Sequence, residues 1–320
     1  IMGFLTRYGT LWGTVPETTG DVFWVSPADS YSVGGNTYPA SDDNDGLSPE
    51  RALRTPAEAI SNARADNGDV IMMLPGTHTS ASQVALSKAG LTFIGAHPVT
   101  RIAPQIRTYA LGTKVNWTST FAGTAVANTA ADCAFVGINM IPLTARTFMS
   151  MIATPRNAFI GCAVTLSAAA STSTKGIVFS GAACANCSFV DCVFLDSVAT
   201  SAQGPAIDLT AAADFLIEGC DFLCTGTSSA WAVAIQCGAG TSGIFRGNFI
   251  GSQGAGTITI GVDGTGVAVA NAVNVINNRY GVSPGAGAFK NFATTEAPLV
   301  ENYYMTVGAG LGTVIQTINA

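Results

Sequence analysis

The chain has 320 residues, of which only 11% are charged, and its formal net charge at pH 7 is −6. A chain so poor in lysine and arginine lacks the clustered basic residues that general nucleic-acid binding requires, so we expect no nucleic-acid partner. Its apolar runs all fall short of the ~18–20 residues that cross a bilayer, so we also expect no membrane partner.

The first 22 residues form an apolar strip with few charges. They lack an apolar core behind a basic start, so we expect no secretory signal peptide and assembly in the cytoplasm. Because an exposed apolar strip is costly, we expect residues 1–22 to be an arm that anchors the chain to another protein. Folding back along its own chain is the alternative. The expected contact residues are Phe4, Leu5, Tyr8, Leu11 and Trp12.

Residues 23–320 are expected to form one domain, which opens with a loop and a helix over about 40–68. Thr55 is the expected N-cap of a helix of about ten residues, with Pro56 at its first position, and a strand over 70–74 follows. The loop SDDNDG (41–46) partly mimics a calcium-binding loop but has Ala52 in place of the last ligand. We therefore expect a solvated turn there and no metal.

One apolar position then recurs every 24–30 residues, after a first interval of 42 that we expect to hide an extra turn. A repeating unit of this length predicts a solenoid of stacked coils, here over about 69–310. We expect roughly 9–11 coils. The recurring position holds Phe93, Phe135, Phe159, Phe189, Ile217, Phe245, Val275 and Val300.

Two residues after this position stand residue types that tolerate a positive φ, which predicts a structural corner in each coil. The expected corners are Gly137, Gly161, Asp191, Gly219, Gly247 and Asn277. The next position is expected to point inward and to stack from coil to coil. This internal ladder would contain Cys162, Cys192, Cys220, Asn248 and Asn278.

A second short strand recurs with isoleucines at 152, 177, 207 and 235. Stacked coils with two or more short strands each pair in parallel and bury a continuous core. The sequence therefore predicts an all-β fold, a parallel β-helix solenoid with a short N-terminal capping helix. The eight cysteines have no zinc-like spacing with the two histidines, and we expect free thiols.

The strings DNDGLSPERALRTPAEAISNA (43–63) and GDVIMMLPGTH (68–78) resemble the opening segment of pectin-lyase-like right-handed β-helix proteins. MGFLTRYGTLWG (2–13), taken with SDDNDGLSPERAL (41–53), is similar to β-helix virion proteins of tailed bacteriophages. This resemblance implies a right-handed β-helix and a place on the virion.

Enzymes of this fold need acids and a base on one outward face. Acids in the coils are scattered, and no histidine follows His97. The nearest approach to an acid pair is Asp191 with Glu218 on adjacent coils. Since Val190, Glu218 and Arg246 align, we expect a surface ion pair there. We therefore expect no catalytic residue, no cofactor and no metal.

We thus expect a phage structural protein of the capsid surface, a decoration or cement protein that stabilises the capsid. Its expected partners are the major capsid protein or other virion proteins and copies of itself, with a trimer as one option. One alternative is a tail fibre, tailspike or receptor-binding β-helix. The other is a carbohydrate-active β-helix enzyme, either a polysaccharide lyase or a hydrolase.

Overall fold

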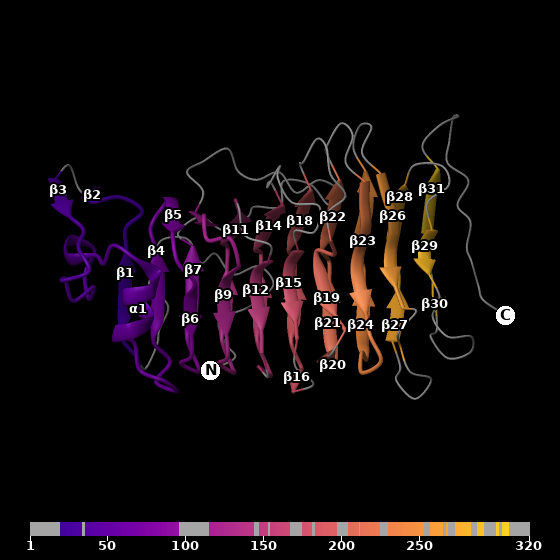
Figure 1. Cartoon of the computed structure of the whole chain (residues 1–320), viewed down its shortest axis with the longest axis horizontal. Coiled ribbons are helices and arrows are strands. Elements are labelled where there is room, and N and C mark those ends of the chain that lie inside the picture. The colour runs from indigo at the N-terminus through magenta and orange to yellow at the C-terminus, as the bar shows by residue number, and fades with distance from the viewer. Residues whose placement is uncertain are drawn as a thin grey trace.

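The computed structural model shows coils stacked along one long axis (Figure 1). It describes residues 20–33, 36–95, 115–143, 147–152, 154–166, 175–180, 183–196, 204–210, 212–224, 230–252, 257–264, 267, 273–282, 287–290, 299–300 and 303–306. Three parallel sheets form the walls, and each coil contributes one strand to each wall in most of the molecule. The expected parallel β-helix is confirmed.

The first sheet holds ten strands in the described part of the chain, within the expected range of coils. At a spacing of ~4.8 Å, nine steps between ten strands make a stack about 43 Å long. The strands, in spatial order, are β1 (Val22–Val25), β4 (Val70–Met73), β7 (Thr92–Gly95), β10 (Ala134–Val136), β13 (Ala158–Ile160), β17 (Ser188–Val190), β21 (Phe215–Glu218), β24 (Gly243–Arg246), β27 (Val273–Ile276) and β30 (Leu299–Val300).

The second and third sheets run alongside the first. The second contains β5 (Gly76–Ser80), β8 (Val115–Ser119), β11 (Asn139–Pro142), β14 (Ala163–Leu166), β18 (Val193–Asp196), β22 (Asp221–Cys224), β25 (Phe249–Ser252), β28 (Arg279–Val282) and β31 (Tyr303–Thr306). The third contains β6 (Val84–Leu86), β9 (Thr124–Asn128), β12 (Thr147–Met151), β15 (Lys175–Phe179), β19 (Ile207–Leu209), β23 (Ala230–Cys237), β26 (Thr257–Asp263) and β29 (Gly287–Lys290).

Short accessory elements lie outside these walls. They are the antiparallel pair β2 (Ser30–Val33) and β3 (Asn36–Pro39), the 3-10 helix η1 (Pro49–Arg51), the helix α1 (Pro56–Asn62), and the parallel pair β16 (Cys184–Ala185) and β20 (Ala212–Ala213). Figure 1 places α1 and the β2–β3 pair at the N-terminal end of the stack. Among the described residues, no helix is long and apolar enough to cross a membrane.

The core is a column of stacked aromatic rings. Phe93, Phe135, Phe159 and Phe189 occupy successive rungs of the first sheet, with ring centroids 5.1, 4.8 and 4.7 Å apart. All four side chains are fully buried. Each such ring pair contributes roughly 0.5–1.5 kcal/mol beyond its burial, so the column fixes the register between coils as well as filling them.

The expected ladder needs correction at three places. Phe93 pairs directly with Phe135, so the 42-residue interval is a single coil and hides no extra turn. At the last rung Val275 pairs with Leu299, not Val300. On the third sheet Ile177 pairs with Met149, whereas Ile152 is 42% exposed at the end of its strand. At Val300 and Ile152 the predicted residue is an apolar residue close to the one that occupies the rung, so the sequence pattern did not separate the two positions.

The capping helix is shorter than expected, at seven residues. Thr55 is its N-cap and accepts a hydrogen bond from the Glu58 backbone N–H at 3.2 Å. Its C-terminal end is fixed from outside, because Lys88 Nζ donates to the carbonyl oxygens of Ser61 and Ala63 at 2.5 and 2.6 Å. A residue 25 positions away thus ends the helix, which the local sequence does not reveal.

Asp69 explains why the first coil begins where it does. Its fully buried carboxylate accepts the backbone N–H of Arg64 and Asp21 at 2.6 and 2.8 Å. Burial alone would raise the pKa of Asp69, but these hydrogen bonds and one from Asn67 lower it overall. The contact also fixes β1, which begins at Val22, so the solenoid already includes the last residue of the range expected for the arm.

Candidate functional site

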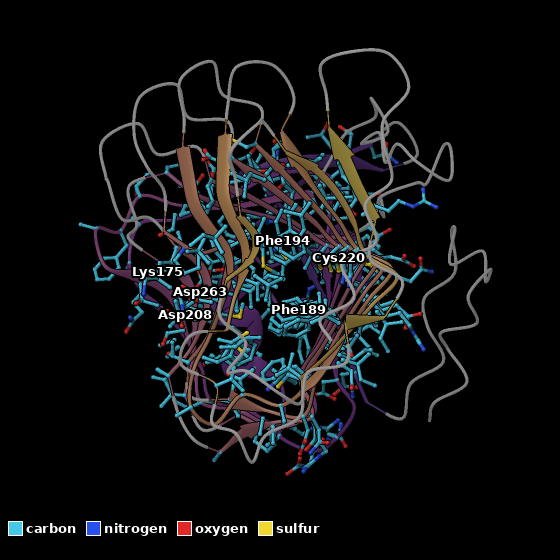
Figure 2. The ribbon with its side chains drawn as sticks, turned by 90° about the vertical axis from the view of Figure 1, so that its right-hand side faces the viewer. Lys175, Phe189, Phe194, Asp208, Cys220 and Asp263 are labelled. Atoms are coloured by element: carbon cyan, nitrogen blue, oxygen red, sulfur yellow. The ribbon has the colours of Figure 1, made fainter. Side chains whose placement is uncertain are left out.

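The outward side of the third sheet carries a row of polar residues on successive rungs. Val178 pairs with Asp208, Asp208 with Gln236, and Gln236 with Asp263. At ~4.8 Å a rung, the backbones of the two aspartates lie about 10 Å apart. Figure 2 shows Lys175, Asp208 and Asp263 at one wall of the coil, away from Phe189 and Phe194 inside it.

The burial pattern of the strands produces this row. Ala206 and Ile207 are both fully buried, so two successive residues face the interior before the chain turns Asp208 outward. The next strand repeats the pattern with Ala234 and Ile235. Asp208 then stands between the buried Ile207 and Leu209, which is the outward position given by ordinary strand alternation.

The two aspartates are unusually buried for outward residues, at 5% exposure for Asp208 and 9% for Asp263. Asp208 Oδ2 pairs with Lys175 Nζ at 2.8 Å, and Asp208 Oδ1 accepts the Thr210 N–H at 3.2 Å. Burial, with the nearby Asp263 and Asp208 carboxylates, raises the pKa of the Cys237 thiol far above its usual range. Lys175 is thus engaged by Asp208, and the rung after Asp263 carries a second lysine, Lys290.

Two carboxylates separated by roughly 6.5–9.5 Å suit an inverting glycosidase, in which one acts as acid and the other as base. Asp208 and Asp263 are two rungs apart in backbone register, about 10 Å, with Gln236 on the rung between them. Within the described ranges, no group of three His, Cys, Asp or Glu side chains is placed to hold a metal ion.

The aligned residues Val190, Glu218 and Arg246 do occupy successive rungs of the first sheet. Glu218 Oε2 and Arg246 Nη2 form an ion pair at 2.9 Å, and the Arg246 side chain is 48% exposed. Asp191 lies beside them at a corner with φ 55°, and its N–H donates to the Glu218 carbonyl oxygen at 3.0 Å. The arrangement is a surface ion pair next to a turn.

The expected corners share one backbone conformation. Their N–H groups donate along the stack to the next coil, as Gly161 does to the Val190 carbonyl oxygen at 2.9 Å. Gly95 differs, because a side chain there would overlap the Gly137 carbonyl oxygen, which requires glycine for close approach. The φ values are 66° at Gly137, 55° at Gly161, 55° at Asp191, 62° at Gly219, 65° at Gly247 and 52° at Asn277.

The internal ladder is a run of buried donors that point back along the stack. The thiols of Cys162, Cys192 and Cys220 donate to the carbonyl oxygens of Phe135, Phe159 and Phe189 at 3.2, 3.3 and 3.5 Å. On the following coils the side-chain amides of Asn248 and Asn278 donate to the Ile217 and Phe245 carbonyl oxygens at 3.0 and 2.9 Å. All eight cysteines are buried and unbridged.

The acids of the 41–46 loop are engaged by the chain itself. Asp42 accepts the backbone N–H groups of Arg54 and Thr55, both at 2.9 Å, and Asp45 pairs with Arg51 at 2.9 Å. The loop thus ties η1 and α1 to the end of the solenoid. The expected arm contacts Phe4, Leu5, Tyr8, Leu11 and Trp12 lie outside the described residues.

The outward side of the first sheet is apolar. We call the six consecutive outward residues of its first six rungs the apolar row; all are half-buried except Met72, which is 7% exposed. The rungs that follow carry Glu218, Arg246 and Ile276. The row consists of Trp24, Met72, Ile94, Val136, Ile160 and Val190.

Two features follow from the repeat but were not predicted from the sequence, the polar row of the third sheet and the apolar row of the first. The match of Ile207 with Ile235 already puts Asp208 opposite Gln236, and the same spacing reaches Asp263. The polar row was not predicted because each acid was considered by itself and not by its register on the third sheet. The apolar row likewise follows from the phenylalanine ladder, one position later in each strand.

Comparison with known proteins bears on the fold. No protein-family model matches the chain, and no curated protein matches its sequence. Among solved structures, a pectin methylesterase from Aspergillus niger has a TM-score of 0.53 at 14% identity, over 96% of this chain and 94% of that one. A rhamnogalacturonan lyase has a TM-score of 0.55 at 12% identity, over 85% and 73% of the two chains. A pectin methylesterase from carrot has a TM-score of 0.50 at 13% identity, over 91% and 83%.

These similarities define the class of protein as a right-handed parallel β-helix of the pectin-lyase-like type. At such low identity they show the fold alone, since this architecture carries many functions.

Proposed function

We propose that this chain is a structural protein of a bacteriophage particle that acts by binding other proteins, as a capsid decoration protein. The observation that carries the proposal is the contrast between two outward faces. On the first sheet six consecutive outward residues are apolar, whereas Glu218 and Asp208 are each held in an ion pair within the chain. Apolar outer faces serve protein contacts, and paired acids are poor general acids or bases.

The phage class rests on the likeness of segments 2–13 and 41–53 to virion proteins of tailed phages. The described structure supports a role in assembly through two features. The core is filled by stacked rings, and the chain carries few charges that would repel neighbouring proteins. A rod with one apolar side suits close packing against a shell.

The test is to locate the protein on particles of the phage that encodes it, by gold-labelled antibody and electron microscopy. Label over the capsid is the expected result. Label confined to the tail would replace this proposal with the tail fibre alternative, and particles without label would overturn both.

A truncated chain adds a second test of incorporation. Because β1 begins at Val22, the deletion should remove residues 1–19 only. We expect the shortened chain to keep its β-sheet circular dichroism and to be lost from particles. Normal incorporation would contradict the anchoring arm, while labelling of the full chain would still test the decoration role.

A second candidate function is favoured by the polar row and by the fold comparisons, which support it more directly than they support a virion role. Asp208 and Asp263 flank Gln236 on one outward face, and the similar structures are a rhamnogalacturonan lyase and pectin methylesterases. In this reading the chain acts on a pectin-type polysaccharide, with Asp208 and Asp263 as its carboxylates. Replacing Asp263 by Asn should then abolish turnover without unfolding the chain.

A further inference from the structure

The outer face of the first sheet is continuous along the whole stack. Its outward residues are paired in register from Trp24 on β1 through Val190 on β17, and on through Glu218, Arg246 and Ile276. Because the strands pair in one unbroken register, the outward residues recur at the same spacing on every rung. A partner with the same spacing can therefore contact consecutive rungs in the same way.

Beside the apolar row, the second outward column is small on three rungs and continues with the apolar residues Leu216 and Ile244. Ala134, Ala158 and Ser188 are the outward neighbours on β10, β13 and β17, and they too are half-buried. Small side chains let a second sheet approach closely, and facing sheets pack about 10 Å apart. The face is therefore shaped for another sheet.

The other two walls are largely polar on the outside. On the second sheet Asn139 Nδ2 donates to Asn116 Oδ1 and Thr165 Oγ1 donates to Asn139 Oδ1, both at 2.9 Å. On the third sheet the Asp208 row occupies the equivalent place. The second sheet has a short apolar run of its own, Leu195 and Leu223 on adjacent rungs. Among the described walls, the first sheet offers the longest run of consecutive apolar rungs.

The two charges on this face identify the occupant. Glu218 and Arg246 stand on adjacent rungs, one acid and one base. If two copies of the face meet antiparallel about a two-fold axis between these rungs, each Glu218 lies opposite the Arg246 of the other copy. The same symmetry places Val190 opposite Ile276. The face is thus complementary to itself in charge and in apolar character.

We propose that this face binds a second copy of the same chain, antiparallel, with the two-fold axis between the Glu218 and Arg246 rungs. The inference deepens the proposed function, on which it rests, by naming the partner of the apolar face. The overlap spans the last six rungs of the first sheet, about 24 Å. Trp24, Met72, Ile94 and Val136 extend beyond the overlap and remain open to the shell.

A matched pair of lysine substitutions tests the proposal in solution. Val190 and Val178 lie on the same coil, are both half-buried and outward, and each precedes an acid on the next rung, Glu218 and Asp208. We expect the wild-type chain to be dimeric in sedimentation velocity at micromolar concentration. Val190→Lys should raise the dissociation constant at least about 100-fold, because each dimer would bury two lysine ammonium groups against the apolar Ile276 side chains of the opposite copies. Val178→Lys should leave it unchanged.

Charge exchange tests the antiparallel geometry. Glu218→Arg and Arg246→Glu should each dissociate the dimer, since each homodimer then sets like charges against each other. An equimolar mixture of the two variants should form a heterodimer, because opposite charges again face each other. If the Glu218–Arg246 ion pair acted only within one chain, mixing the two variants would not restore association.

Several results would overturn the inference. These are a wild-type chain that is monomeric at 100 µM or more, equal effects of the two lysine variants, or a mixture that stays monomeric. Circular dichroism on each variant separates loss of pairing from loss of fold. Labelling of particles is measured separately, so a monomeric chain that still decorates capsids would sink this inference and leave the proposed function standing.

Discussion

Asn278 binds Asn248 twice: its side-chain oxygen accepts both the backbone N–H and the side-chain amide of Asn248, each at 2.9 Å. Both residues are almost fully buried, at 1% and 2% exposure. The amide ladder therefore satisfies backbone groups that the sheets leave unpaired at the corner between the first and second walls. Upstream, Cys162, Cys192 and Cys220 fill the same place with thiols.

Replacing Asn278 by Ala should destabilise the chain by about 2–4 kcal/mol, because it strands two donors of Asn248 and the Phe245 carbonyl oxygen in the core. Urea unfolding followed by circular dichroism measures the change. Asn274→Ala on β27, the strand that precedes Asn278, is the control, since Asn274 is half-buried on the outward side, and it should cost less than about 1 kcal/mol. Equal costs would show that the ladder bonds contribute nothing.

The cysteines should be inert in the folded chain. Burial raises the pKa of the Cys133 and Cys187 thiols to about 11, so roughly one thiol in a thousand is ionised at pH 8. We expect negligible alkylation of the native chain over hours and alkylation of all eight thiols after denaturation without reductant, as counted by mass spectrometry. Recovery of a Cys192–Cys220 disulfide would refute the free-thiol ladder.

His78 should make the fold sensitive to acid. Its ring is 1% exposed, Nε2 bonds the Leu74 carbonyl oxygen at 2.8 Å, and Nδ1 has no hydrogen-bond partner among the residues that the structure describes. Burial lowers its pKa from 6.5 to about 4, so between these values the unfolded chain binds a proton that the folded chain does not. Stability should be unaffected above about pH 6.5 and should fall by about 3 kcal/mol as the pH drops to 4.

Unfolding free energies of the wild type and of His78→Leu at a series of pH values isolate this contribution, because the carboxylates are common to both chains. We expect the difference between the two chains to change by about 3 kcal/mol between pH 6.5 and 4. Parallel curves would contradict the assignment of the acid sensitivity to His78.

Lys175 should stabilise the chain through Asp208, whose carboxylate is nearly buried. Lys175→Met leaves that charge without its cation and should cost about 1–2 kcal/mol, less than a fully buried pair because the Lys175 side chain is 37% exposed. Lys175→Arg should retain most of the stability in thermal unfolding. A Met variant as stable as the wild type would show that solvent alone can satisfy Asp208.

The fold was predictable because its core repeats one residue type. Phe135, Phe159 and Phe189 recur at a spacing that only stacked coils explain, and the structure pairs them in register. Strand ends were less predictable. At Ile152 and Val300 an apolar residue stands close to the true rung, so composition does not distinguish the two positions.

The polar row was harder to predict, for a physical reason. Asp208 faces outward by ordinary alternation between the buried Ile207 and Leu209, but its register with Gln236 and Asp263 becomes apparent only when the third-sheet strands are aligned. Its partner Lys175 lies 33 residues away and reaches it through the stacking of coils. Pairing between coils, and not spacing along the chain, brings these charges together.

We propose above all that the chain binds proteins and performs no chemistry on polysaccharide. The most direct test incubates the purified chain with pectin, rhamnogalacturonan and host cell-surface glycans and follows methanol release, unsaturated ends and reducing ends. We predict no turnover above the blank for the wild type and for the Asp208→Asn, Asp263→Asn, Asp191→Ala and Glu218→Ala variants. Turnover by the wild type that falls at least about 100-fold in any of these variants, the usual contribution of a positioned acid or base, would contradict the claim and establish an enzyme.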